Sequence, residues 1–321
     1  MTGRRAVFAA SLEQSEQLFK AARAADDGIR PMLLFYGLSQ ATRAVAAAAM
    51  KLDEGWRPTA HGLSCSGEPQ RPPDIADLTV KPSEPTRSAT KKEMDPADGG
   101  GAFGILQTVL SSETWPRSAT VTLGALLAAH PSLEGFPGRE EEWPAMSYTG
   151  ETRDVLENWE EPVSVFQILL APAAGDRAWT RYTEMPDHYQ MLATASIAPR
   201  PPTGGGDPLQ LDATFPEGNR PMMHRRTTVE RHWMTPDLGG TRGNQPRLVL
   251  YWAIAYALSM RARYDPEGWT RDLNPDGPRY AELLRTVLQQ ILNECPGLIN
   301  QAIRFVSQEG PVRDVEDDPR R

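Results

Sequence analysis

The most apolar stretch of the chain lies near its C-terminal end, where Leu248–Leu258 contains no charged residue. A helix that is apolar on every side belongs inside a domain. The run is shorter than the roughly 20 apolar residues that a membrane-spanning helix needs. Because Pro266 disfavours the α conformation at Asp265, we expect a central buried helix that ends there.

Helical spacing of apolar residues predicts two helices near the N-terminus. Residues 11–25 carry an apolar stripe, and Ser11 followed by Gln14 resembles a capping box. Residues 31–51 follow as a long, mostly apolar helix with a proline in its first turn. The short link between the two helices favours antiparallel neighbours.

The C-terminal part predicts one more long helix, over residues 277–307, which Pro296 is expected to kink or break. The helices from both ends of the chain therefore form the predicted core. We expect a single domain over residues 11–308, with a helical core of 11–52 and 246–308, an insertion of 53–245, a flexible N-terminus of 1–10 and a disordered tail of 309–321.

The stretch between the two helical parts is rich in proline and glycine, which favours long loops. Apolar and β-branched runs within it predict strands at residues 79–81, 162–171 and 227–234. A strand end running into a short helix is expected at 121–129. The predicted fold class is mainly α, or α+β: a helical bundle with a loop-rich α/β insertion.

Composition narrows the function only slightly. The formal net charge of −8 argues against a broad surface that coats nucleic acid. The two cysteines, Cys65 and Cys295, match no metal or redox spacing, which indicates reduced thiols. The N-terminus lacks the apolar segment of a secretory signal, so we expect a cytoplasmic protein. No metal-binding or cofactor-binding motif is present.

Two predicted helices share a local pattern, YGLSQATR at Tyr36–Arg43 and YALSMRAR at Tyr256–Arg263. Helical spacing brings the shared side chains of each close to one face. Two such faces could meet and hold an anion such as a phosphate. The alternative is that each arginine caps carbonyls or pairs with a carboxylate. The shared side chains are Tyr36, Ser39, Arg43, Tyr256, Ser259 and Arg263.

Three stretches make the chain similar to the YaaC-like proteins of bacteria: Arg30–Val45, His61-Gly62-Leu63 and Tyr256–Trp269. The last contains a Ser-x3-Arg-Tyr-x-Pro-x2-Trp core. The resemblance implies one family module over most of the chain, and it implies no known reaction. We add His61 to the ligand-binding candidates. A catalytic pairing of this histidine with the nearby Cys65 is disfavoured, because residues so close in sequence rarely face each other.

A second hypothesis is a HEPN-type ribonuclease acting in phage defence. Such helical enzymes use a closely spaced arginine and histidine, where the histidine moves a proton and the arginine stabilises the phosphorane. Arg181…His188 and Arg226…His232 have comparable spacing but fall in predicted loops or strands. Arg226 also lies in a basic patch, 220–232, that could contact phosphates.

The sequence thus favours a protein that binds a partner protein or a small phosphate-bearing ligand, such as a nucleotide, and leaves enzyme activity open. His232, Arg226 and His188 are the catalytic candidates of the ribonuclease hypothesis. The buried helices are also compatible with a homo-oligomer. Neither a membrane anchor nor a metal is expected.

Overall fold

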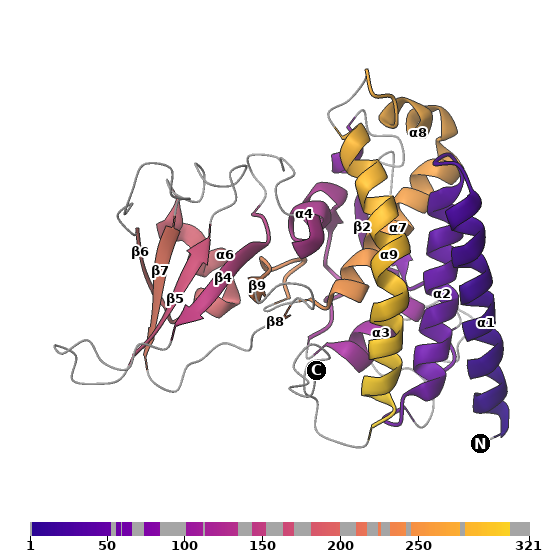
Figure 1. Cartoon of the computed structure of the whole chain (residues 1–321), viewed down its shortest axis with the longest axis horizontal. Coiled ribbons are helices and arrows are strands. Elements are labelled where there is room, and N and C mark those ends of the chain that lie inside the picture. The colour runs from indigo at the N-terminus through magenta and orange to yellow at the C-terminus, as the bar shows by residue number, and fades with distance from the viewer. Residues whose placement is uncertain are drawn as a thin grey trace. The chain divides into compact units, whose positions relative to one another are not determined.

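A computed structural model shows the fold of the chain (Figure 1). It describes residues 2–52, 56–58, 60–65, 74–83, 101–111, 113–133, 143–151, 163–169, 181–199, 210–216, 224–225, 232–241, 245–276 and 280–308. These form two compact units. The first contains the described residues of Met1–Leu126, Gly239–Thr241 and Gln245–Val315, and the second those of Leu127–Leu238.

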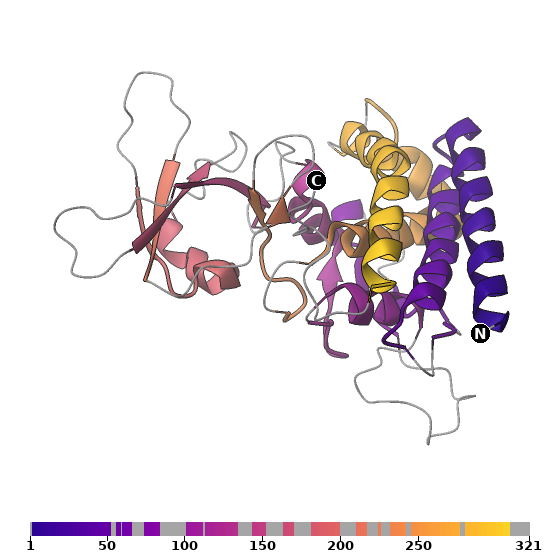
Figure 2. The ribbon, with the colours of Figure 1, turned by 60° about the horizontal axis from the view of Figure 1, so that its bottom comes forward.

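The first unit is a helical bundle. Its helices are α1 (Thr2–Ala24), α2 (Arg30–Ala48), α3 (Ala102–Leu110), α7 (Arg247–Tyr264), α8 (Pro266–Asp272) and α9 (Ala281–Val306). Helix α2 packs against α1, α7 and α9, and it lies between α1 and α9 in both views (Figures 1 and 2). Helices from the two ends of the chain thus share one core, as the sequence predicted. No helix in the described part of the chain is long and apolar enough to cross a membrane.

Helix α7 is the buried centre of this unit. Every residue from Leu248 to Ser259 is buried, which confirms the predicted central helix. The helix ends at Tyr264, as the Asp265-Pro266 pair predicted. The chain then starts α8, where Asp265 Oδ1 accepts a hydrogen bond from the Gly268 backbone N–H at 3.0 Å.

The predicted start of the first helix at Ser11 was wrong, because α1 begins at Thr2. Residues 2–10 are therefore helical, and Ser11 lies inside the helix instead of capping it. Arg4 gives a physical reason for this early start. Its guanidinium donates to the carbonyl oxygens of Ala46 (3.3 Å) and Ala49 (2.8 Å) and so caps the end of α2.

Helix α9 continues through Pro296 without a break. Of the two outcomes expected at this proline, a kink or a break, the break was therefore wrong. Proline removes one backbone hydrogen bond from a helix interior. Apolar side chains on both sides of it, including Leu292 and Ile299, are buried and hold the helix on the core. The packing of this long amphipathic helix therefore outweighs the local cost of Pro296.

Gly297, on the exposed side of α9, offers a test of this helix. A Cβ at Gly297 would meet nothing within 4 Å. We expect Gly297→Ala to raise the free energy of unfolding by about 0.5–1 kcal/mol, because alanine has the higher helix propensity. Urea denaturation followed by circular dichroism measures the change. A lower stability would contradict a regular helix at this position.

A small antiparallel sheet belongs to the same unit. Its order is β1 (Leu63–Ser64), β2 (Thr79–Pro82) and β3 (Val121–Thr122). Strand β3 runs directly into α4 (Leu123–Ala128), so the strand-to-helix transition and the strand at 79–81 are both confirmed. The first compact unit extends to Leu126, and the insertion of 53–245 stays a prediction.

The second unit is built on an antiparallel sheet of order β6-β7-β5-β4-β9-β8. The strands are β4 (Met146–Glu151), β5 (Val163–Leu169), β6 (Ser196–Pro199), β7 (Gln210–Pro216), β8 (His224–Arg225) and β9 (His232–Met234). Strand β5 confirms the prediction at 162–171. Its Ile168 packs in a buried cluster with Met185 of α6 (Met185–His188), Tyr189 and Phe215. Short 3-10 turns lie at Ile75–Asp77, Pro131–Leu133, Tyr182–Glu184 and Gln190–Leu192.

The fold is therefore α+β and mainly helical, as predicted. The strand expected at 227–234 is present from His232, and residues 227–231 lie outside the described residues. The predicted disordered tail, 309–321, also lies outside them.

Candidate functional site

Helices α2 and α7 bring the two similar segments of the sequence into contact. Tyr36 of α2 accepts a hydrogen bond from Nη2 of Arg263 in α7. The Arg263 guanidinium also lies 5.2 Å from the centroid of the Tyr36 ring, a cation–π geometry. Phe35 and Tyr256 meet edge to face with ring centroids 5.3 Å apart. The aromatic residues of one segment therefore position the arginine of the other.

His61, in the loop that precedes β1, packs against the same aromatic residues. Its ring centroid lies 5.0 Å from that of Phe35, 6.5 Å from that of Tyr36 and 6.4 Å from that of Tyr256. The side chain keeps access to solvent. Packing of the ring removes part of its water and lowers the pKa of His61, and the charges of Arg263 and Arg43 lower it further. The imidazole is therefore held neutral at physiological pH.

Arg43 completes a cationic surface around this histidine. The side chain of Arg43 is exposed on α2 and makes no ion pair with any described residue. The hydrogen bonds of Arg263 run to the hydroxyls of Tyr264 and Tyr36, which raise the pKa of its guanidinium. We call these residues, Tyr36, Arg43, His61 and Arg263, the Arg43–Arg263 face.

The backbone that carries His61 is fixed by the start of α3. The Phe103 N–H donates to the His61 carbonyl and the Ala102 N–H to the Ala60 carbonyl, both at 2.9 Å. Gly101 has φ +119°, and a Cβ there would lie 2.6 Å from the Gly62 nitrogen. Only glycine permits this close approach. The loop is thus clamped, while the His61 imidazole itself hydrogen-bonds to no described residue.

The remaining predicted ligand-binding residues lie behind this surface. Ser39 is 7 % exposed and Ser259 only 1 %, and the Ser259 hydroxyl donates to the Tyr256 carbonyl at 2.8 Å. Tyr256 is also buried, which raises its pKa well above the ordinary value. These three residues support the site from the core, because a ligand in solvent reaches none of their polar atoms directly.

Cys65 does not pair with His61 as a nucleophile. The thiol is buried, and burial raises the pKa of Cys65 to about 12. Since the thiolate is the nucleophilic form, this cysteine is inert at neutral pH. Within the described ranges, no group of three or more histidine, cysteine or carboxylate side chains is placed to hold a metal ion.

Comparison with protein-family models matches residues 3–303 to the YaaC-like proteins. The chain belongs to the YaaC-like family. This match covers nearly the whole chain and confirms the resemblance inferred from the sequence. No curated protein matches the chain, and no solved structure does either. The function of this YaaC-like chain therefore has to be inferred from its own residues.

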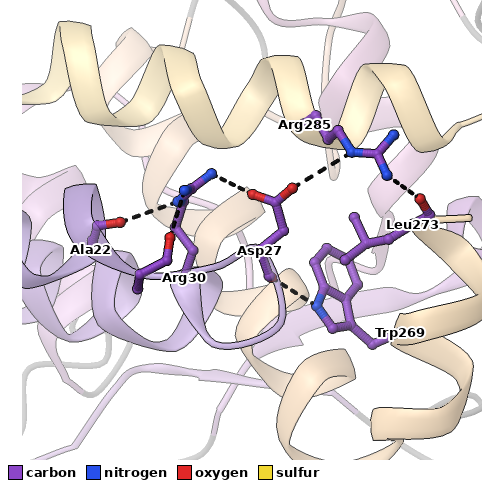
Figure 3. Close-up of polar contacts among 7 residues, drawn as sticks. Ala22, Asp27, Arg30, Trp269, Leu273 and Arg285 are labelled. Carbon is purple, nitrogen blue, oxygen red and sulfur yellow. Dashed lines mark hydrogen bonds and ion pairs between the residues drawn. The ribbon is translucent and has the colours of Figure 1, made fainter. Parts of the chain in front are cut away.

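Two stretches that identify the YaaC-like chain meet at Asp27, in the turn between α1 and α2 (Figure 3). Its carboxylate pairs with Arg30 and, at 3.5 Å, with Arg285, and its carbonyl accepts from Trp269 Nε1 at 3.1 Å. Arg30 and Arg285 also donate to backbone carbonyls of Ala22, Ala25 and Leu273. This network ties α1, α8 and α9 together. Its two arginines share a carboxylate, so their charge is partly compensated within the protein.

A second internal cluster of the YaaC-like chain surrounds Arg261, whose side chain is fully buried. It pairs with Asp265 (2.6 Å) and Asp272 (2.8 Å). A Cβ at Gly268 would lie 2.2 Å from the Asp265 Oδ2 atom, so only glycine fits beside this ion pair. These residues explain the Asp-Pro-x-Gly part of the C-terminal motif as structural. Arg43 and Arg263 differ from Arg261 because they face solvent or lie near it.

The described ribonuclease candidates belong to the second unit and not to the helical bundle. His188 ends the short helix α6 and stacks on Trp143 at 4.7 Å, and Arg181 is paired with Glu184. His232 lies on strand β9, opposite Tyr148 of β4, and Arg226 lies outside the described residues. His188 lies on α6 and His232 on β9, whereas the HEPN hypothesis places its histidine on a helix of the bundle.

Sequence reasoning missed two residues of the site, Phe35 and Tyr264. Phe35 packs on both His61 and Tyr256. Tyr264 hydrogen-bonds Arg263, and 47 % of Tyr264 is exposed. Both residues adjoin a predicted site residue in the sequence, but neither belongs to the pattern that the two segments share. The contact of His61 with both helices had no sequence signal beyond the family resemblance.

Proposed function

We propose that this YaaC-like protein binds a small phosphate-bearing ligand at the Arg43–Arg263 face. The observation that carries the proposal is that Arg43 of α2 and Arg263 of α7 both act electrostatically on the solvent-accessible His61, and that Arg263 donates to Tyr36, whose ring lies 6.5 Å from that of His61. Arginine guanidinium groups bind phosphate oxygens by paired, charge-assisted hydrogen bonds.

The electrostatics of the face support an anion rather than a neutral ligand. Arg263 is oriented by tyrosine hydroxyls, and Arg43 makes no ion pair in the described part of the chain. Elsewhere in the bundle, Arg30, Arg247 and Arg261 are each paired with a carboxylate. Cations placed close together without a compensating acid repel each other, and a bound phosphate removes that repulsion.

We expect replacement of Arg43 or Arg263 by alanine to weaken the binding of inorganic phosphate by about tenfold or more. A hydrogen bond to a charged group contributes about 1.5–3 kcal/mol, which corresponds to this loss. Isothermal titration calorimetry of the purified chain with inorganic phosphate at low ionic strength measures the effect. Native mass spectrometry of the same preparation, with analysis of released compounds, identifies any phosphorylated ligand that co-purifies.

Arg23→Ala is the matched control. Arg23 is an exposed arginine near the end of α1, in no ion pair with a described residue, so the substitution changes the net charge by the same amount. We expect this variant to bind phosphate like the unmodified protein. Equal losses in all three variants would show general charge attraction and overturn the proposal, as would the absence of phosphate binding.

A further inference from the structure

We propose that the Arg43–Arg263 face cleaves ribonucleotide phosphodiesters, with His61 as the general base that activates the adjacent 2′-hydroxyl. This inference rests on the proposed function, because the phosphate bound by the two arginines is the group that reacts. It moves the catalytic centre of the ribonuclease hypothesis from His188 and His232 to a histidine of the helical unit.

His61 has the geometry of a base rather than that of a structural histidine. Its imidazole hydrogen-bonds to no described residue, although the backbone around it is clamped by α3. The ring is supported on one side by Phe35, at 5.0 Å, and it retains solvent access. Loss of water on packing, and after it the charges of Arg263 and Arg43, lower the pKa of His61 and favour the neutral form, which can accept a proton at physiological pH. A neutral imidazole on a clamped loop, with no hydrogen bond to a described residue, therefore lies near the cations that would bind a phosphate.

The reaction conserves atoms and charge. A ring nitrogen of His61 takes the proton of the 2′-hydroxyl, and the 2′-oxygen forms a bond to phosphorus. The bond from phosphorus to the 5′-oxygen of the next nucleotide then breaks, and this oxygen takes a proton from water. The products are a 2′,3′-cyclic phosphate and a free 5′-hydroxyl, and the proton on His61 returns to solvent.

The two arginines stabilise the transition state, in which negative charge develops on the phosphate. Arg43 and Arg263 would place their positive charges beside the phosphate, where negative charge accumulates on the non-bridging oxygens. The ribonucleotide supplies its own nucleophile, and well-oriented internal nucleophiles act at effective concentrations of about 10⁵–10⁸ M. One base and two cations therefore suit a substrate that carries a 2′-hydroxyl next to the phosphodiester.

The test uses the dinucleotide uridylyl-3′,5′-adenosine and its 2′-deoxyuridine analogue, with products separated by liquid chromatography. We expect release of adenosine and uridine 2′,3′-cyclic phosphate from the ribonucleotide alone. His61→Ala should lower the cleavage rate by about 10²–10⁴-fold, and Arg43→Ala by about 10²–10³-fold. His61→Ala should still bind inorganic phosphate, because both arginines remain.

His188→Ala, purified by the same procedure, is the matched histidine control and should cleave like the unmodified protein. Phosphate binding without cleavage would overturn this inference and leave the proposed function intact. Loss of both would overturn the two together. Cleavage of the deoxy analogue, cleavage by His61→Ala at the unmodified rate, or loss of cleavage in His188→Ala would each contradict His61 as the base.

Discussion

Replacing Arg261 with alanine is expected to lower the free energy of unfolding by about 3–5 kcal/mol. The side chain is fully buried and pairs with Asp265 at 2.6 Å and Asp272 at 2.8 Å. Removing the guanidinium leaves two carboxylates in the core without their cation, which costs more than the ion pair itself contributes. Urea denaturation monitored by tryptophan fluorescence measures the loss.

The loss should also depend on pH. Burial raises the pKa of Asp272, while the hydrogen bond and charge of Arg261 oppose that rise. Without Arg261 the folded-state pKa of Asp272 rises further, and such a group destabilises the fold as pH increases through that value. The deficit of Arg261→Ala should therefore be larger at pH 8 than at pH 5.

Arg23→Ala provides the comparison for the same charge change. Arg23 lies exposed on α1, and we expect this variant to change stability by no more than about 0.5 kcal/mol. A small, pH-independent effect of Arg261→Ala would show that the two aspartates find other partners and would refute the argument.

The helical part of the fold was predictable because its signals are local and redundant. The apolar run alone indicates that α7 is buried, and Asp265-Pro266 alone indicates where this helix ends. The start of α1 was not predictable in this way. Its first turns depend on Arg4 reaching the carbonyls at the end of α2, a contact more than 40 positions away in sequence. The break expected as one outcome at Pro296 did not form for the same reason, since tertiary packing outweighs its local preference.

The candidate site was likewise predictable only where the sequence signal is local. The repeated pattern placed Tyr36 and Arg263 on two helices, and the structure brings these residues together. The spacing of apolar residues could not show that Ser39 and Ser259 are buried. On a helix that is apolar on most sides, this spacing does not tell which positions face the core. Nor could it distinguish Arg261 from Arg263. One is paired inside the core and the other lies at the edge with tyrosine partners, and only the packing of α8 separates them.

Gly101→Ala is expected to reduce both stability and the cleavage of uridylyl-3′,5′-adenosine. Gly101 has φ +119°, and a Cβ there would lie 2.6 Å from the Gly62 nitrogen and 2.7 Å from the Ala60 carbonyl oxygen. Both contacts are backbone atoms, so no change of side-chain rotamer relieves them. Backbone strain of this kind costs about 1–3 kcal/mol. The overlap must also push residues 60–62 away from α3, and these residues carry His61.

Two measurements separate the local effect from general unfolding. Urea denaturation gives the stability of Gly101→Ala, and chromatography of the dinucleotide products, at a temperature where the variant remains folded, gives its cleavage rate. Gly28→Ala is the matched control, because a Cβ there would meet nothing within 4 Å. We expect the control to cleave normally, and Gly101→Ala to cleave more slowly even when fully folded, while both variants bind inorganic phosphate through Arg43 and Arg263. A normal cleavage rate in folded Gly101→Ala would mean that the position of the His61 loop does not matter for catalysis.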